Sequence, residues 1–400
     1  MRKELTRHIR EDTGRLSEAS RRHYLSKLDT LVRRYGGDGP SSLVAVINDA
    51  PRVIPRLQSD ADRRGRGAHA QTVHAYCSSV LALLDRIPRH ETQEAGILPS
   101  ARDAWASCSR AASRATRRKY VNHLASDRQR EGYVPWEELV RRRQRLEEEE
   151  GTPPSRARLL LSMLTMAPPM RTSDLGSLRV LRVPEDLPAL PTSVRDVERS
   201  AVLSRGNHLV LPSLPRRHEK TAPAVLVMTE YKTAERYARA GKRKQRREAE
   251  EKKDDFVAPF AQDRVLDGPR DEDEAKRRNR KEEDEEATRV RIGYLSDALT
   301  AVVRDSLAAH SREWLFEGEG GRPFVLENSF NQMALRELRW LFDGRPVTVN
   351  LVRHAAVAWL DRQKPRNREL ELYFQYWMMH TRDMQREYLL LRNLASDDFR

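Results

Sequence analysis

The chain has 400 residues, which is longer than one ordinary domain and suits two or three. It contains 74 Lys and Arg against 60 Asp and Glu, and this formal net charge of +14 makes a polyanion the first class of partner to consider. The two cysteines lie outside any CxxC or Cys/His cluster, which argues against a disulfide framework or a zinc site, and no apolar run approaches the length of a membrane span.

The N-terminal part of the chain shows helical periodicity. Apolar residues recur at helical spacing over residues 17–35 and again over residues 71–88, where Cys77 lies on the apolar face. A shorter helical region is predicted between them over residues 41–60. We therefore expect a small, basic, all-helical domain over residues 1–92.

The pattern changes along the second part of the chain. Arg-rich helical patterns are expected to connect the domains over residues 93–154, and residues 153–166 are apolar on most sides, which predicts a buried helix. The stretch SAVLSRGNHLVLPS resembles two short strands around a turn at Gly206 and Asn207, and AVLVMTEY and TRVRI are further extended runs. Helical patterns return after residue 293. The predicted fold class is mainly α with a small antiparallel β-sheet (α+β).

Two nearly pure charge runs occupy residues 241–288. Neither run can bury a face, so this segment is expected to be a solvated, disordered insertion. If LVMTEYKT and TRVRI are paired strands, residues from about 236 to 287 extend the same hairpin that carries Lys232.

Standard motifs for nucleotide binding and hydrolysis are missing from the sequence, since no GxxxxGK[ST], HExxH or GxSxG occurs. A scattered set of polar residues remains in the second half. Taken singly, each is more often structural or solvated. In chain order they are Arg171, Asp174, Lys232, Arg353, His380 and Tyr388.

These residues stand in stretches that resemble the motifs of the tyrosine recombinase/integrase family. The stretches are PPMRTSDLGSL, EYKTAERY, NLVRHAAV and MMHTRDMQREY, and in style they are closest to eukaryotic viral and mobile-element members. The resemblance covers roughly residues 155–400. Five motif residues in the right order are far more specific than any one of them, and these five are Arg171, Lys232, Arg353, His380 and Tyr388. It implies a helical core-binding domain over residues 1–92, followed by a catalytic domain over residues 93–400.

The resemblance implies a site-specific recombinase or integrase that cleaves and rejoins DNA through a covalent 3′-phosphotyrosyl intermediate, with no metal or other cofactor. Tyr388 would be the nucleophile, Arg171 and Arg353 would hold the phosphate, and Lys232 would protonate the leaving oxygen. His380 would bond the phosphate, Asn350 would take the first position of the second-arginine box, and Asp174 would orient the site.

Partners and location follow from the same resemblance. The partners would be double-stranded DNA and other copies of the chain, as a homo-oligomer (tetramer) on paired sites, with no membrane. The N-terminus shows no apolar signal segment, so an intracellular, DNA-associated protein is expected, in the nucleus if its source is eukaryotic or viral.

Two departures from the family pattern keep other functions open. Asn350 stands where a His is usual; it can donate to a phosphate but cannot shuttle a proton, and His354 is a candidate substitute. His380 and Tyr388 are eight residues apart, one fewer than usual, so an ideal helix would turn them about 80° apart unless it breaks between Thr381 and Met384. The alternatives are a catalytically weak DNA-binding or packaging factor and a topoisomerase IB-like relaxing enzyme.

Overall fold

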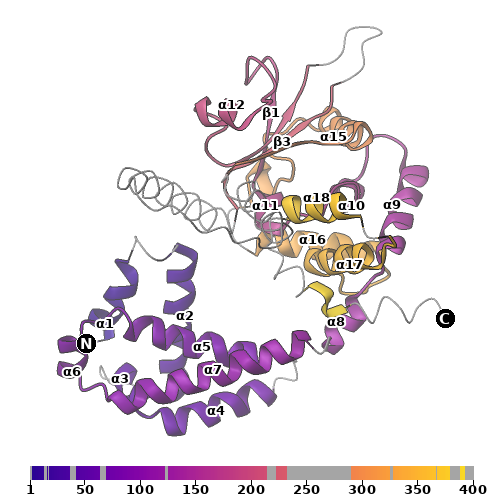
Figure 1. Ribbon diagram of the computed structural model, residues 1–400. Coiled ribbons are helices and arrows are strands. Elements are labelled where there is room, and N and C mark those ends of the chain that lie inside the picture. The colour runs from indigo at the N-terminus through magenta and orange to yellow at the C-terminus, as the bar shows by residue number, and fades with distance from the viewer. Residues whose placement is uncertain are drawn as a thin grey trace, which may run out of the picture. The chain divides into compact units, whose positions relative to one another are not determined.

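The computed structural model forms two compact units, Met1–Arg130 and Glu131–Arg400 (Figure 1). The insertion predicted over residues 241–288 lies outside the residues that the structure describes, and so do Lys232 and His380. The described residues are 2–12, 16, 18–36, 42–63, 69–121, 125–213, 222–231, 290–324, 328–365, 367–378 and 388–391.

The described part of the N-terminal unit is built from helices, and helical residues lie in each of the three stretches where the sequence predicts them. In chain order the helices are α1 (Arg2–Arg10), α2 (Glu18–Tyr35), α3 (Ser42–Asn48), α4 (Ala50–Arg63), α5 (His69–Leu84), α6 (Arg89–Glu94), α7 (Pro99–Val121) and α8 (Asp127–Gly132), the last of which crosses the unit boundary.

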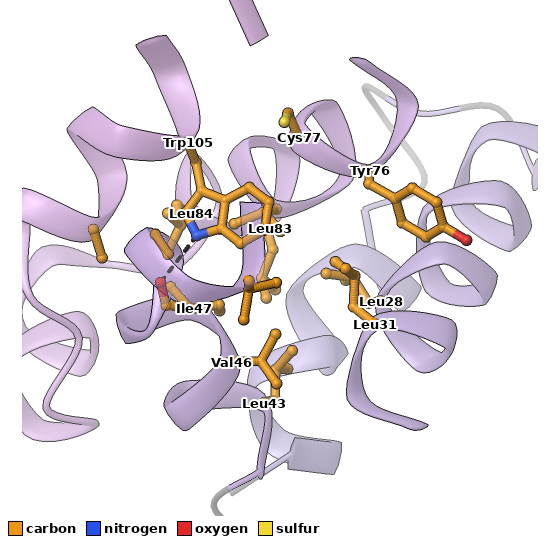
Figure 2. Packing of buried hydrophobic residues seen from close by; sticks show 14 of the residues in the cluster. Leu28, Leu31, Leu43, Val46, Ile47, Tyr76, Cys77, Leu83, Leu84 and Trp105 are labelled. Carbon is orange, nitrogen blue, oxygen red and sulfur yellow. Dashed lines mark hydrogen bonds between the residues drawn. The ribbon is translucent and has the colours of Figure 1, made fainter. Parts of the chain in front are cut away.

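Helix α7 belongs to the core of this unit. Its buried residues Ala101, Trp105, Cys108 and Ala112 recur at helical spacing and join the cluster formed by the other helices. Trp105 is fully buried, and its Nε1–H donates to the carbonyl oxygen of Ile47 over 2.9 Å (Figure 2). The compact unit therefore extends beyond the boundary predicted at residue 92. The sequence did not indicate this because the apolar face of α7 is interspersed with many arginines.

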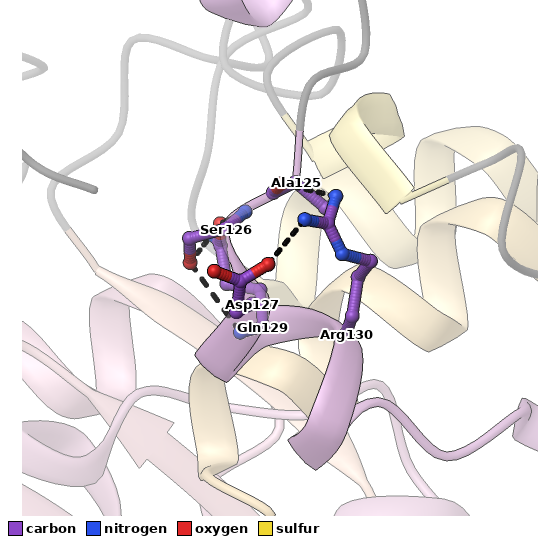
Figure 3. A network of polar contacts seen from close by, with 5 residues as sticks. All are labelled: Ala125, Ser126, Asp127, Gln129 and Arg130. Carbon is purple, nitrogen blue, oxygen red and sulfur yellow. Dashed lines mark hydrogen bonds and ion pairs between the residues drawn. The ribbon is translucent and has the colours of Figure 1, made fainter. Parts of the chain in front are cut away.

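Helix α8 begins with a reciprocal cap just before the unit boundary (Figure 3). The backbone N–H and the hydroxyl of Ser126 both donate to Oε1 of Gln129 over 2.9 Å, and the backbone N–H of Gln129 donates back to the Ser126 hydroxyl over 3.4 Å. Arg130 donates to the carbonyl oxygen of Ala125 over 2.8 Å and pairs with Asp127. Local bonds thus fix where this helix starts.

The C-terminal unit contains a four-stranded sheet in the order β1-β2-β3-β4, with β1 (Leu178–Arg182), β2 (Asn207–Leu211), β3 (Val225–Met228) and β4 (Arg291–Tyr294). β1 and β2 are parallel, and the other neighbours are antiparallel. The prediction of an antiparallel sheet was therefore wrong, and the sheet is mixed. The parallel pair needs a crossover, which residues 183–206 provide with helix α12 (Val194–Arg199).

The predicted hairpin around Gly206 is also absent, because residues 201–204 form turns and Leu203 packs into the core on one face of the sheet. Strands β3 and β4 are paired, as a hairpin around the charged insertion requires, since Met228 lies opposite Arg291 and Val225 opposite Tyr294. The two strands that flank the charged insertion are therefore neighbours.

Helices make up most of the rest of this unit. They are α9 (Trp136–Glu150), α10 (Arg156–Thr165), α11 (Thr172–Gly176), α15 (Asp297–Ala309), α16 (Ser329–Leu341), α17 (Val349–Arg362) and α18 (Arg368–Met378), with 3-10 turns η1 (Glu319–Gly321) and η2 (Leu389–Leu391). The described chain is thus mainly helical with a small sheet, as predicted.

Helix α10 is buried from Ala157 to Leu164, as its apolar sequence predicts, and it contacts α9, α15 and α16. Helix α18 lies against β4, where the Tyr376 hydroxyl accepts from the backbone N–H of Ile292 over 3.1 Å and the Trp377 ring covers Gly293 so closely that a Cβ there would clash. None of the described helices is long and apolar enough to cross a membrane.

Candidate active site around Arg353 and Tyr388

Arg171 and Asp174 share one tight turn after the buried helix α10. Arg171 is the extended residue that precedes α11, with φ −73° and ψ 158°, and its carbonyl oxygen accepts the backbone N–H of Asp174 over 3.1 Å. Two prolines at residues 168 and 169 separate this turn from α10, and prolines cannot continue a helix because they lack the backbone N–H. The sequence therefore places both side chains beside the end of α10.

Helix α17 carries Arg353 into the interior. The Thr348 hydroxyl caps this helix by accepting the backbone N–H of Leu351, and ten of its fourteen residues are buried. Arg353 is only 1% exposed. Its Nε–H donates to the Tyr388 hydroxyl over 3.0 Å, one terminal nitrogen donates to the carbonyl oxygen of Met378 over 2.8 Å, and the other donates to the carbonyl oxygen of Pro169.

Through these bonds Arg353 joins three segments that are far apart in sequence, namely the loop before α11, the end of α18 and the segment of Tyr388. A planar guanidinium suits this task because its donors have a fixed geometry. Burial lowers the pKa of Arg353, and the nearby charge of Arg171 acts in the same direction, whereas Tyr388 and Asp174 favour the protonated form. The side chain nevertheless remains a cation, since an arginine is effectively always protonated in proteins.

Asp174 interacts electrostatically with both Arg171 and Arg353. The carboxylate is 2% exposed and accepts the Ser173 hydroxyl over 3.0 Å. Burial raises the pKa of Asp174, while Arg171, the bond from Ser173 and then Arg353 act against this rise. Because both arginines act on one buried carboxylate, Arg171 and Arg353 belong to the same cluster, and Asp174 is suited to orient them.

Tyr388 is buried against α17. Its hydroxyl accepts from Arg353, and its ring lies 4.9 Å from the His354 ring between centroids, at an angle of 58°. The guanidinium carbon of Arg353 is 5.1 Å from the centre of the Tyr388 ring, within the range of a cation–π contact. His354 also contacts the backbone of Tyr388, with Nδ1 at 2.8 Å from the carbonyl oxygen.

A second hydrogen-bond network connects the Arg171 turn to the end of strand β3. The Ser177 hydroxyl donates to the carbonyl oxygen of Asp174 over 3.1 Å, and the side-chain amide of Asn207 donates both to this hydroxyl and to the carbonyl oxygen of Glu230. The amide oxygen of Asn207 accepts the backbone N–H groups of Thr229 and Glu230. The backbone two residues before Lys232 is therefore fixed relative to the turn of Arg171.

The structure brings together four of the residues that the sequence singles out, Arg171, Asp174, Arg353 and Tyr388. Asn350 is exposed in the first turn of α17, three residues before Arg353. Neither Lys232 nor His380 is described, and the helix break predicted between Thr381 and Met384 also lies outside the described residues.

Sequence reasoning missed the acceptors of Arg353 at Pro169 and Met378, because a backbone carbonyl has no sequence signature. It also missed Asn207, whose only signal was its place in a supposed turn. The adjacency of His354 to Arg353 was visible in the sequence, but not its contact with Tyr388.

Among the described residues, no group of three or more His, Cys, Asp or Glu side chains could hold a metal ion. Comparison with protein-family models finds no match for the chain. Comparisons with curated proteins and with solved structures likewise find no match.

Proposed function

We propose that the chain is a tyrosine recombinase, a DNA strand-breaking and rejoining enzyme that acts through a covalent 3′-phosphotyrosyl intermediate. The observation that carries the proposal is the bond from Arg353 to the Tyr388 hydroxyl, in a cluster with Arg171 and Asp174. Arg171 and Tyr388, which are more than 200 positions apart in the sequence, both interact with Arg353. These residues are the types that metal-independent phosphodiester cleavage needs.

The chemistry follows from this arrangement. As the Tyr388 oxygen bonds to phosphorus it gives up its proton to water, and the bond from phosphorus to the 5′ oxygen breaks. Arg171 and Arg353 stabilise the charge on the non-bridging oxygens, with Asn350 and His380 as further donors, and Lys232 gives a proton to the leaving oxygen. A guanidinium has five N–H groups, so Arg353 can keep its three protein bonds and still donate to a phosphate.

DNA binding must also open this site. Arg353 is 1% exposed and Tyr388 is 9% exposed, so a phosphate can reach them only after neighbouring residues move. In the described structure the Tyr388 hydroxyl is held on Arg353.

The distribution of charge supports DNA as the partner. Residues 1–130 hold 25 Lys and Arg against 14 Asp and Glu, an excess of +11, whereas residues 131–400 hold 49 against 46. The N-terminal unit therefore carries most of the net charge of the chain, as expected for a unit that contacts DNA phosphates.

A catalytically weak DNA-binding factor is the second candidate. Asn350 favours it, because an amide cannot accept the proton of the nucleophile, and in the structure this residue is exposed. Only the recombinase, and not the DNA-binding factor, would act as a tetramer on paired DNA sites.

A nicked suicide DNA substrate, from which the cleaved 5′ end diffuses away, tests the proposal. We expect a covalent protein–DNA adduct in denaturing gels that is lost in Tyr388→Phe. Tyr373→Phe is the matched control, since Tyr373 is a partly exposed tyrosine on α18 and its variant should still form the adduct. Peptide mapping of the adduct should identify Tyr388. Tight DNA binding without any adduct would instead favour the weak binding factor.

A further inference from the structure

His354 contacts Tyr388 at two different points. Its Nδ1 lies 2.8 Å from the backbone carbonyl oxygen of Tyr388, and its ring lies against the phenol ring. Arg353, the preceding residue on α17, bonds the hydroxyl of the same tyrosine. Two neighbouring side chains of one helix therefore hold both the backbone and the hydroxyl of Tyr388.

The hydrogen bond defines the tautomer of His354. A carbonyl oxygen can only accept, so Nδ1 carries the proton and donates it to Tyr388, and Nε2 has no proton in the neutral ring. Burial, with a contribution from the charge of Arg353, lowers the pKa of His354 to about 4. The ring is therefore neutral at ordinary pH and serves as a fixed donor.

These properties disfavour His354 as the base that deprotonates the tyrosine. A group whose pKa is about 4 accepts a proton at neutral pH only at a high cost in free energy. The one proton of the neutral ring is engaged by a backbone carbonyl, and the ring contacts the carbonyl and the phenol ring of Tyr388.

We propose that His354 is a positioning residue, whose Nδ1–H holds the backbone of Tyr388 so that the phenol oxygen stays on Arg353. This inference rests on the proposed function. A bond at the hydroxyl alone leaves the tyrosine segment free to pivot about that bond, whereas a second bond at the carbonyl fixes both ends. Since α17 is buried along most of its length, both anchors are parts of one rigid element.

Two amide variants separate positioning from other roles. The side-chain nitrogen of Asn can take the place of Nδ1, whereas that of Gln reaches the place of Nε2, so the two variants differ in where the donor sits. We expect His354→Asn to form the covalent adduct within about threefold of the wild-type single-turnover rate. His354→Gln and His354→Leu should be slower by about 10- to 100-fold, with unchanged affinity for duplex DNA.

Each other role predicts a different pattern. If His354 were the base, Asn could not replace it, and all three variants would lose the adduct. If His354 only filled space, Leu would do as well as Asn. Either result overturns the proposal, as does a wild-type rate in His354→Gln.

A fluorine label gives a readout that does not need cleavage. With 3-fluorotyrosine placed at residue 388 of the full chain, the fluorine NMR line without DNA should be alike in wild type and His354→Asn and should shift or broaden in His354→Gln. If wild type forms no adduct, the proposed function fails, while the fluorine line still shows whether His354 holds Tyr388. A line unchanged in every variant overturns the inference even where cleavage is observed.

Discussion

The protonation of His354 couples the stability of the C-terminal unit to pH. Its pKa is near 6.5 in an unfolded chain and about 4 in the folded one, so between these values the unfolded state binds a proton that the folded state does not. The free energy of unfolding should therefore be highest above about pH 6.5. It should fall by up to roughly 3 kcal/mol as the pH is lowered toward 4. Urea denaturation at a series of pH values measures this loss.

The control for this prediction is His354→Asn, which removes the titrating group and keeps the donor. Burial also lowers the pKa of His208, which acts in the same direction, and raises the pKa of Asp174, which acts in the opposite direction. Both groups remain in the variant, so their contributions cancel when the curve of unfolding free energy against pH for the variant is subtracted from that of the wild type. Parallel curves for wild type and His354→Asn would contradict the prediction.

At the residue scale, candidate site residues could be proposed from the sequence, whereas their surroundings could not. Arg171, Asp174, Arg353 and Tyr388 were singled out because they stand in stretches that resemble the recombinase motifs. The environment of each residue was not predictable, since burial of Arg353 depends on carbonyl groups that any residue could supply. The same reason explains why Asn207 went unnoticed.

At the scale of elements, long periodic stretches were predicted well and short ones were not. Helices α2, α5, α10 and α15 repeat their apolar residues over several turns, which specifies both the element and its buried face. Strand β1 has five residues, too few for alternation to be distinguished from chance. A parallel partner cannot be inferred from local pattern either, because the crossover of residues 183–206 decides it.

Helix α7 carries an exposed face of arginines. Arg110, Arg114, Arg117 and Arg118 are exposed, and at about 100° per residue they fall within one face of the helix. The sequence has no Asp or Glu from residue 104 to residue 126. This arginine face therefore carries positive charge with no acidic residue of its own helix nearby.

Neutralising the arginine face should weaken binding to any duplex. For the triple variant Arg110→Gln, Arg114→Gln and Arg117→Gln, we expect the slope of log affinity against log salt to fall by up to about 3, close to one unit per lost phosphate contact. Fluorescence anisotropy over a range of salt concentrations measures the slope.

The matched control removes three arginines that are paired with acids in the same unit, Arg7, Arg33 and Arg102. It changes the net charge equally, but it should leave the slope closer to that of the wild type. Equal slopes in the two triple variants would show that net charge, and not the arginine face of α7, governs binding.

At the scale of the whole molecule, core and charge are divided between the two units. The N-terminal unit has its own cluster of buried residues, which runs from Leu5 to Ala112. The four described residues of the candidate site all belong to the C-terminal unit. Binding of DNA and cleavage of DNA should therefore be separable on the chain.

A fragment of residues 1–130 tests this division. Because none of the described residues of its core lies beyond position 112, it should be helical by circular dichroism and unfold cooperatively, with a free energy of unfolding of about 5–10 kcal/mol. It should bind duplex DNA in a salt-dependent manner, because it carries +11 of the net charge of +14. The complementary fragment, residues 131–400, has an excess of only +3 and should bind more weakly under the same conditions. An N-terminal fragment that folds but binds no better than its complement would show that the charge of this unit serves another purpose.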